Sequence, residues 1–296
     1  MKETIVPIKS ALGLFGDFTQ VTNKRGGRVY RLDFLPNRPS VPSVTSVVDN
    51  SLRNHGLEHW RNNWILEGLR QNRNQTVTNE LIEDVMSAST LEADRSKNLG
   101  VAAHKLIEKV LREEDINEEL MDDQMDGVLR SFLRWRKEFG DWSVVDTEVG
   151  VWEYDVETGR GYAGQVDAIF QKGNTLMIVD WKTSSGIYES AAIQLAAYTE
   201  ALRTMIEVDD HSKVMSAASN QNGHRPPVDS VVACCVRLVS DYPRDQHYKK
   251  MRHMPKVMNG NVEYSWITEE WFDVFTAAFI LSENPLALDK KMLGEE

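Results

Sequence analysis

Cysteine and long apolar runs are both scarce in this chain of 296 residues. It has only 2 cysteines, Cys234 and Cys235, and two adjacent cysteines in an apolar stretch exclude a disulfide framework. No apolar run reaches the roughly 18 residues that a membrane-spanning helix needs, and the first residues lack the continuous apolar segment of a secretion signal. We therefore expect a soluble protein of a reducing cytoplasm, with no membrane partner.

Positive charge is also in short supply. The 34 lysines and arginines are outnumbered by 45 acidic residues, which leaves a formal net charge of -11. A protein that coats nucleic acid usually has a basic surplus, so the balance counts against a simple nucleic-acid-binding module. An enzyme with a local basic channel remains compatible, because the sum does not describe how the charges are distributed. The chain also lacks a Gly-x-x-x-x-Gly-Lys-Ser/Thr phosphate loop, so we expect no helicase motor within it.

The first half of the chain changes from a strand pattern to a helix pattern. Residues 18–34 alternate in polarity on both sides of a glycine-containing turn, which predicts a β-hairpin, and three prolines between residues 36 and 42 then interrupt the chain. From Ser43 to about Glu138, apolar residues recur at intervals of three and four and predict three to five helices.

The second half predicts a mixed sheet with flanking helices. Strand patterns cover residues 143–152, 162–171, 175–182 and 231–239. Helices are expected at 188–206 and 269–281, a hairpin at 246–267 and a mobile polar loop at 209–227. The fold class is therefore α/β (α+β), a central mixed β-sheet flanked by helices with an N-terminal helical region. We expect one compact unit with three segments: 1–42, a hairpin and proline-rich lead-in; 43–140, a helical region; and 141–296, the core.

Two acidic motifs lie on either side of a predicted turn. Gly164-Gln165-Val166-Asp167 precedes the dipeptide Gly173-Asn174, and Asp180-Trp181-Lys182 follows it. A two-residue turn at this dipeptide places Asp167 directly opposite Asp180. Cross-strand partners have Cβ atoms about 4.5–5.5 Å apart, and like charges so close repel unless a proton or a cation lies between them. The motif therefore predicts a divalent metal site with an ammonium group beside it.

A simpler interpretation of this motif is a surface ion pair, because Asp, Asn and Gly are common near strand ends. The apolar run Thr175–Val179 argues against that interpretation, since it is typical of a buried strand and ends directly in Asp-Trp-Lys. Charged residues at the end of a buried strand usually bind a metal or take part in function.

Four further residues accompany the two motifs. Glu148 lies in a predicted strand just upstream, where the pattern by itself favours a solvent-facing glutamate. Gln194 and Tyr198 are four residues apart on the helix that follows, so they share a helix face and form either a substrate contact or an ordinary surface pair. His104 lies at the edge of the apolar stripe of a helix, a position that a core or surface histidine also takes.

Together these residues resemble a known family. His104, Glu148, Gly164-x-x-Asp167, Asp180-x-Lys182 and Gln194-x-x-x-Tyr198 are similar in order and approximate spacing to the motifs of RecB-like exonucleases of the PD-(D/E)XK superfamily. Residues 42–45, Pro-Ser-Val-Thr, also resemble the segment that opens the helical region in phage and mitochondrial genome maintenance exonucleases of this group. The resemblance covers residues 42–200. It implies a restriction-endonuclease-like core and metal-dependent hydrolysis of DNA phosphodiesters.

The resemblance also implies a ligand set for the metal. Asp167 and Asp180 would bind the ion together with His104 and the backbone carbonyl of Trp181. Hard oxygen ligands suit Mg²⁺ or Mn²⁺, and such an ion polarises a phosphate and makes water more acidic. Mg²⁺ or Mn²⁺ is therefore the expected cofactor.

The remaining residues take supporting roles in the same resemblance. Lys182 would position or help deprotonate the attacking water and offset developing charge. Glu148 would assist at the metal shell as a fourth catalytic residue, and Gln194 and Tyr198 would orient the DNA and the site.

The chain departs from parts of this family. Several relatives hold an iron–sulfur cluster with four cysteines, which the 2 cysteines here exclude. Without helicase motifs, the DNA must be linear and end-bearing or single-stranded, or a helicase or recombination protein must act as a partner. The resemblance implies a phage-type exonuclease of DNA recombination, repair or replication, in the cytoplasm of a bacterial or phage-infected cell. The alternatives are an endonuclease of the same superfamily and a non-catalytic DNA-end-binding protein.

Overall fold

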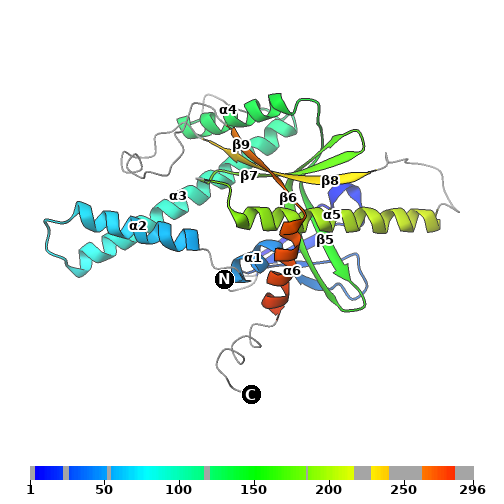
Figure 1. Cartoon of the computed structure of the whole chain (residues 1–296), viewed down its shortest axis with the longest axis horizontal. Coiled ribbons are helices and arrows are strands. Elements are labelled where there is room, and N and C mark those ends of the chain that lie inside the picture. The colour runs from blue at the N-terminus through cyan, green and yellow to red at the C-terminus, as the bar shows by residue number, and fades with distance from the viewer. Residues whose placement is uncertain are drawn as a thin grey trace, which may run out of the picture.

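The computed structural model describes residues 4–22, 27–51, 55–116, 121–184, 186–216, 228–239 and 262–283. Within these ranges the chain forms two β-sheets and six α-helices (Figure 1). None of the helices in these ranges combines the length and the apolar character needed to cross a membrane.

The larger sheet is mixed, and its five strands lie in sequence order. They are β5 (Ser143–Asp155), β6 (Arg160–Lys172), β7 (Thr175–Lys182), β8 (Ser230–Leu238) and β9 (Val262–Ile267). Neighbouring strands run antiparallel except β7 and β8, which are parallel. A parallel pair needs a crossover connection, and α5 (Glu189–Ser216) lies between these two strands in the sequence. Strand β7 is buried along most of its length, which explains its continuous apolar run.

Helices cover both faces of the larger sheet (Figure 1). On one face lie α4 (Asp123–Glu138) and the C-terminal part of α3 (Asn79–Leu111). On the other lie α5, α1 (Val44–Ser51) and α6 (Glu270–Glu283). The architecture is therefore the expected α/β fold, a mixed sheet between helical layers.

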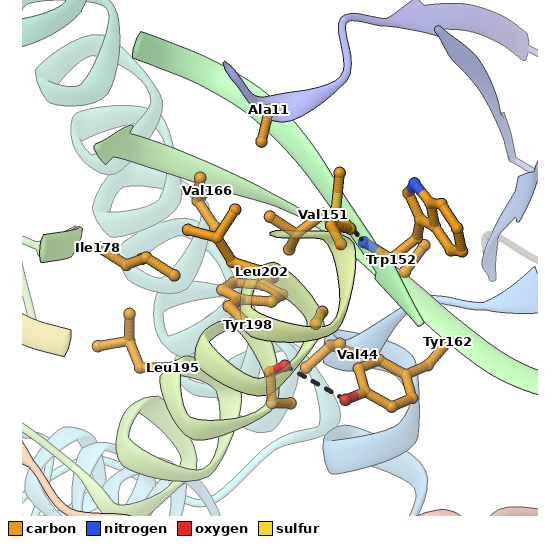
Figure 2. Packing of buried hydrophobic residues seen from close by; sticks show 14 of the residues in the cluster. Ala11, Val44, Val151, Trp152, Tyr162, Val166, Ile178, Leu195, Tyr198 and Leu202 are labelled. Atoms are coloured by element: carbon orange, nitrogen blue, oxygen red, sulfur yellow. Dashed lines mark hydrogen bonds between the residues drawn. The ribbon is translucent and has the colours of Figure 1, made fainter. Parts of the chain in front are cut away.

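Two buried clusters hold these layers together. The α4-side core is rich in aromatic rings, and Trp135 of α4 meets Phe170 of β6 edge to face with 5.3 Å between ring centroids. The α5-side core contains Ile169, the neighbour of Phe170. Ile178 and Leu195, which Figure 2 labels, belong to the same core. Successive residues of β6 thus enter opposite cores, as the two-residue period of a strand requires.

The smaller sheet packs against β5. It consists of β1 (Thr4–Ile8), β2 (Phe18–Thr22), β3 (Arg28–Arg31) and β4 (Ser40–Pro42), all antiparallel. The contact depends on Gly150 of β5, whose N–H donates to the carbonyl of Lys9 at 2.7 Å. A Cβ at Gly150 would lie 2.1 Å from Cζ of Phe18 and 2.8 Å from Cγ2 of Ile8, so only glycine permits this approach. The small sheet therefore lies against the part of β5 that carries Glu148.

The helix α2 (His55–Gln71) and the first part of α3 extend away from both sheets (Figure 1). They contact each other where Gly68 meets Val85, and the buried residues that α3 contributes to the α4-side core, Ala103 and Ile107, lie near its other end. The long helix thus has an outer part that pairs with α2 and an inner part that reaches the sheet.

The sequence predicted the strands of the core and the helices that flank them, with ends that differ by a few residues. The hairpin expected at 18–34 is confirmed by the pairing of β2 with β3, but β1 and β4 add two further strands. The strand β4 includes Pro42, and a proline is tolerated there because β4 lies at the edge of its sheet. The three-segment division at 42 and 140 remains a prediction.

The loop expected at 209–227 is wrong in its first part, because α5 continues to Ser216. Once a helix is established, each added residue gains a backbone hydrogen bond, and residues 209–216 contain neither proline nor glycine to end it. Residues 217–227 lie outside the described ranges. The turn expected at Asn259-Gly260 also lies outside them, and of that hairpin only β9 is described.

The contact at Gly150 generates a stability prediction. We expect Gly150→Ala to lower the free energy of unfolding by about 1–3 kcal/mol, because the added methyl group overlaps a buried phenylalanine ring. Chemical denaturation of the purified protein measures the change. Gly140→Ala is the matched control, since a Cβ there would only touch backbone oxygens at 3.5 and 3.7 Å. Equal effects of the two substitutions would contradict the close approach of the small sheet.

Candidate metal centre

The hairpin between β6 and β7 has the predicted register. Its ladder runs from Lys172 opposite Thr175 to Ala168 opposite Val179. Asp167 and Asp180 occupy the next position, where the ladder ends. Oδ2 of Asp167 accepts a hydrogen bond from the N–H of Trp181 at 2.7 Å, so this carboxylate replaces a backbone partner as the strands part. The carboxylates lie at the end of the hairpin rather than in its regular part.

Strand β6 changes face at Asp167. In a regular strand, residues two apart point to the same side. Val166 belongs to the α5-side core, whereas Ala168 belongs to the α4-side core, so the alternation is interrupted between them. Asp167 lies at this interruption, and its side chain reaches α3 rather than either core.

Strand β5 changes face at the same level. Val149, which pairs with Val166, lies in the α5-side core. Thr147, two residues earlier, instead accepts a hydrogen bond at 3.0 Å from Nε of Arg112, which follows the last residue of α3. Between them Glu148 has a φ of 52°, in the left-handed region that residues other than glycine seldom adopt. Glu148 and Asp167 therefore lie opposite each other, at the point where both strands depart from regular alternation.

Three side chains converge at this level. His104 of α3 places Nδ1 3.1 Å from Oδ1 of Asp167, and one ligand atom from each of His104, Glu148 and Asp167 lies within 4.8 Å of the other two. Ligands on opposite sides of one Mg²⁺ are about 4.2 Å apart, so only a small closure would bring all three onto one ion. The mixture of carboxylate oxygen and imidazole nitrogen suits a divalent cation.

His104 and Asp167 each stabilise the charged form of the other. Burial lowers the pKa of His104, but the charge of Asp167 and the hydrogen bond to it outweigh burial and raise the pKa to about 9. Burial raises the pKa of Asp167, but His104 and Lys182 and the N–H of Trp181 lower it below its usual range. In this arrangement the imidazolium balances the negative charge of the Asp167 carboxylate.

Glu148 carries the opposite shift. Burial, followed by the charges of Asp167 and Glu108, raises the pKa of Glu148 to about 7. Holding this carboxylate in its charged form therefore costs free energy unless a cation lies nearby. A raised carboxylate pKa is expected in a metal centre whose carboxylates lie close together before the ion binds.

Asp180 stands apart from the group of three and pairs with Lys182. Its Oδ2 lies 2.7 Å from Nζ of Lys182, but this atom is buried and completes no aligned hydrogen bond among the described residues. Burial raises the pKa of Asp180; Lys182 opposes this effect and Asp167 adds to it. Burial lowers the pKa of Lys182, but both aspartates raise it more, so the amine is held as an ammonium.

Gln194 and Tyr198 are hydrogen-bonded to each other and lie next to the first acidic motif. Nε2 of Gln194 donates to the hydroxyl of Tyr198 at 2.7 Å, and Tyr198 is buried in the α5-side core (Figure 2). A Cβ at Gly164 would lie 2.1 Å from Cε1 of Tyr198, so the glycine of the first acidic motif makes room for the ring. Burial raises the pKa of Tyr198, and hydrogen bonds with Gln194 and Thr45 oppose this rise, so the segment at 42–45 also reaches the tyrosine.

The structure therefore gathers the predicted residues around the C-terminal end of β7, and five of them form two subgroups. His104, Glu148 and Asp167 form one; Asp180 and Lys182 form the other. Trp181 contributes its N–H to Asp167, while its indole lies in the α4-side core.

One residue of the first motif was not singled out from the sequence. Nε2 of Gln165 donates to Oε2 of Glu148 at 2.9 Å. Strand alternation places residues 165 and 167 on one face, and that was the available signal. The partner could not be predicted, because it depends on the conformation of Glu148.

Comparison with known proteins agrees with this architecture. The model of the PD-(D/E)XK nuclease superfamily matches residues 73–223, slightly more than half of the chain. The matched range contains the candidate centre from His104 to Tyr198. No curated protein is significantly similar to the chain. The mixed sheet between helical layers and the carboxylates where β7 ends agree with this match. The chain belongs to the PD-(D/E)XK nuclease superfamily.

Proposed function

We propose that this chain is a Mg²⁺- or Mn²⁺-dependent DNA exonuclease of the RecB-like kind, with a role in recombination, repair or replication. The observation that carries the proposal is the convergence of His104, Glu148 and Asp167 beside the Lys182–Asp180 pair. The superfamily supports hydrolysis of DNA, and the order of the motifs supports the exonuclease branch.

The donor set fits a divalent cation. The ligands are His104 and Asp167, with Asp180 and the carbonyl of Trp181 completing the set from β7. The buried Oδ2 of Asp180, which lacks an aligned donor, is the kind of atom that a cation would satisfy. A cation held there polarises the scissile phosphate and makes the attacking water more acidic.

Lys182 supplies a positive charge beside the carboxylates. Burial lowers its pKa, but the two aspartates raise it more, so the amine is protonated near neutral pH before an ion binds. An ammonium at the end of β7 can hold the attacking water by donating to it and can offset the negative charge that develops on the phosphate. Transfer of a proton from water to Lys182 would require its carboxylate neighbours to be drawn away first.

Glu148 and the pair on α5 shape the site. Glu148 supplements the ligand shell from β5, while the buried Tyr198 fixes Gln194, which is only partly buried. Tyr198 therefore orients the site, and Gln194 is the member of the pair that can reach DNA.

A labelled-DNA time course tests the activity. We expect linear DNA labelled at the 5′ or the 3′ end, single- or double-stranded, to be shortened progressively with Mg²⁺ or Mn²⁺ and to remain intact with a chelator. Closed circular DNA of the same sequence should survive, because an exonuclease needs an end. Cleavage of the circle would instead identify an endonuclease, and metal-independent binding of ends without turnover would identify a DNA-end-binding protein.

Removal of the ammonium should abolish most of the rate. We expect Lys182→Ala to reduce the rate constant of linear DNA degradation by at least about 100-fold, the usual cost of removing a group that stabilises developing charge. Lys172→Ala on β6 is the matched control, because Lys172 forms a surface ion pair with Asp141 outside the centre. Similar rates for wild-type protein and Lys182→Ala would contradict the assigned role.

Metal binding should stabilise the folded protein through Asp167. At 100 times its Kd, an ion that binds only the folded state adds about 2.7 kcal/mol of stability, which raises the melting temperature. We expect Mn²⁺ to produce this rise in the wild-type protein and a much smaller one in Asp167→Asn. Asp141→Asn is the control, and differential scanning fluorimetry with and without Mn²⁺ is the measurement. An equal rise in all three proteins would place the binding site elsewhere.

A further inference from the structure

The left-handed backbone conformation of Glu148 requires contacts close to this residue. Its neighbours Thr147 and Val149 both remain in the ladder, opposite Ala168 and Val166, so the left-handed backbone at this point is confined to one residue. Glutamate has no conformational preference for positive φ, and such a residue persists only where surrounding contacts determine it.

Gln165 supplies that contact. Its amide nitrogen donates to Oε2 of Glu148 at 2.9 Å and to the main-chain carbonyl of the same residue at 3.2 Å. Both partners are acceptors, so the amide must turn its nitrogen toward them. Two bonds from one amide therefore fix the backbone and the side chain of Glu148 together.

The position of Gln165 makes this role specific. It lies opposite Gly150, two positions along the ladder from Glu148, and its own backbone pairing does not depend on its amide. The side chain is thus available to reach diagonally across the sheet to Glu148. A free glutamate side chain has several rotatable bonds, and fixing it before an ion arrives reduces the entropy lost on binding.

We propose that Gln165 is a positioning residue that holds the Glu148 carboxylate in the metal-binding group of His104, Glu148 and Asp167. The inference rests on the proposed metal centre and adds a residue to it. In this role Gln165 acts through the bonds that it donates to Glu148.

Direct measurement of Mn²⁺ binding tests this role without reference to nuclease activity. Electron paramagnetic resonance reports the free Mn²⁺ that remains when the full-length protein is titrated. We expect Gln165→Met, which keeps a side chain of similar length without the donor, to weaken Mn²⁺ binding by about 10- to 100-fold. Gln171→Met is the matched control on the same strand, where the amide donates to the carbonyl of Gly173 and not to a residue of the centre.

A double-mutant cycle separates positioning from general damage. If Gln165 acts through Glu148, Gln165→Met should cause no further loss of Mn²⁺ affinity in a Glu148→Ala protein. An equal loss in both backgrounds would overturn the proposal. Gln165→Asn, whose shorter amide cannot reach both acceptors, gives the same comparison should Gln165→Met fold poorly by circular dichroism.

Wild-type binding distinguishes the role of Gln165 from the existence of the metal centre. Saturable Mn²⁺ binding by wild-type protein with unchanged affinity in Gln165→Met and Gln165→Asn would overturn the positioning role and leave the metal centre standing. Absence of saturable binding by wild-type protein would overturn the metal centre and, with it, both the proposed function and the role of Gln165.

Discussion

The carboxylate of Asp167 joins the central hairpin to a helix that is distant in sequence. One oxygen accepts the N–H of Trp181 where β6 and β7 separate, and the other meets the imidazole of His104 on α3. A buried carboxylate is stable only with such partners, because burial alone disfavours its charge. The long helix and the two strands of the central hairpin are thus held in one arrangement by a single charged group, and the rest of the candidate centre depends on that arrangement.

Two close approaches of backbone to aromatic rings maintain the surroundings of this group. Gly150 admits Phe18 of the small sheet next to Glu148, and Gly164 admits Tyr198 of α5 just before Asp167. Each glycine lies within three residues of a carboxylate of the centre. The absence of a side chain at these positions lets neighbouring layers pack against β5 and β6 at the level where both strands change face.

The electrostatics of the centre favour a cation at its middle. Burial raises the pKa values of Glu148 and Asp180, while Asp167 is kept ionised by His104 and Lys182. The two cationic side chains compensate part of the negative charge in the absence of metal. A divalent ion that displaced the proton of His104 would neutralise more of the charge on the same carboxylates. The site is thus preorganised for an ion.

Much of this protein follows from local rules that a sequence displays. The Gly173-Asn174 turn determined the register of β6 and β7, because a two-residue turn and a two-residue period leave one pairing. The family motifs likewise identified His104, Glu148, Asp167, Asp180 and Lys182 as candidates.

Only the tertiary structure decided how these residues are shared between the two subgroups. The change of face at Glu148 breaks the alternation on which sequence reasoning relies, and the bonds from Gln165 that accompany it depend on that break. The pairing of Asp180 with Lys182, and of Asp167 with His104 from a helix 63 residues away, depends on which charges meet when distant segments pack. Sequence periodicity describes one strand or helix at a time, whereas the balance of burial and charge at this centre is set by four elements at once.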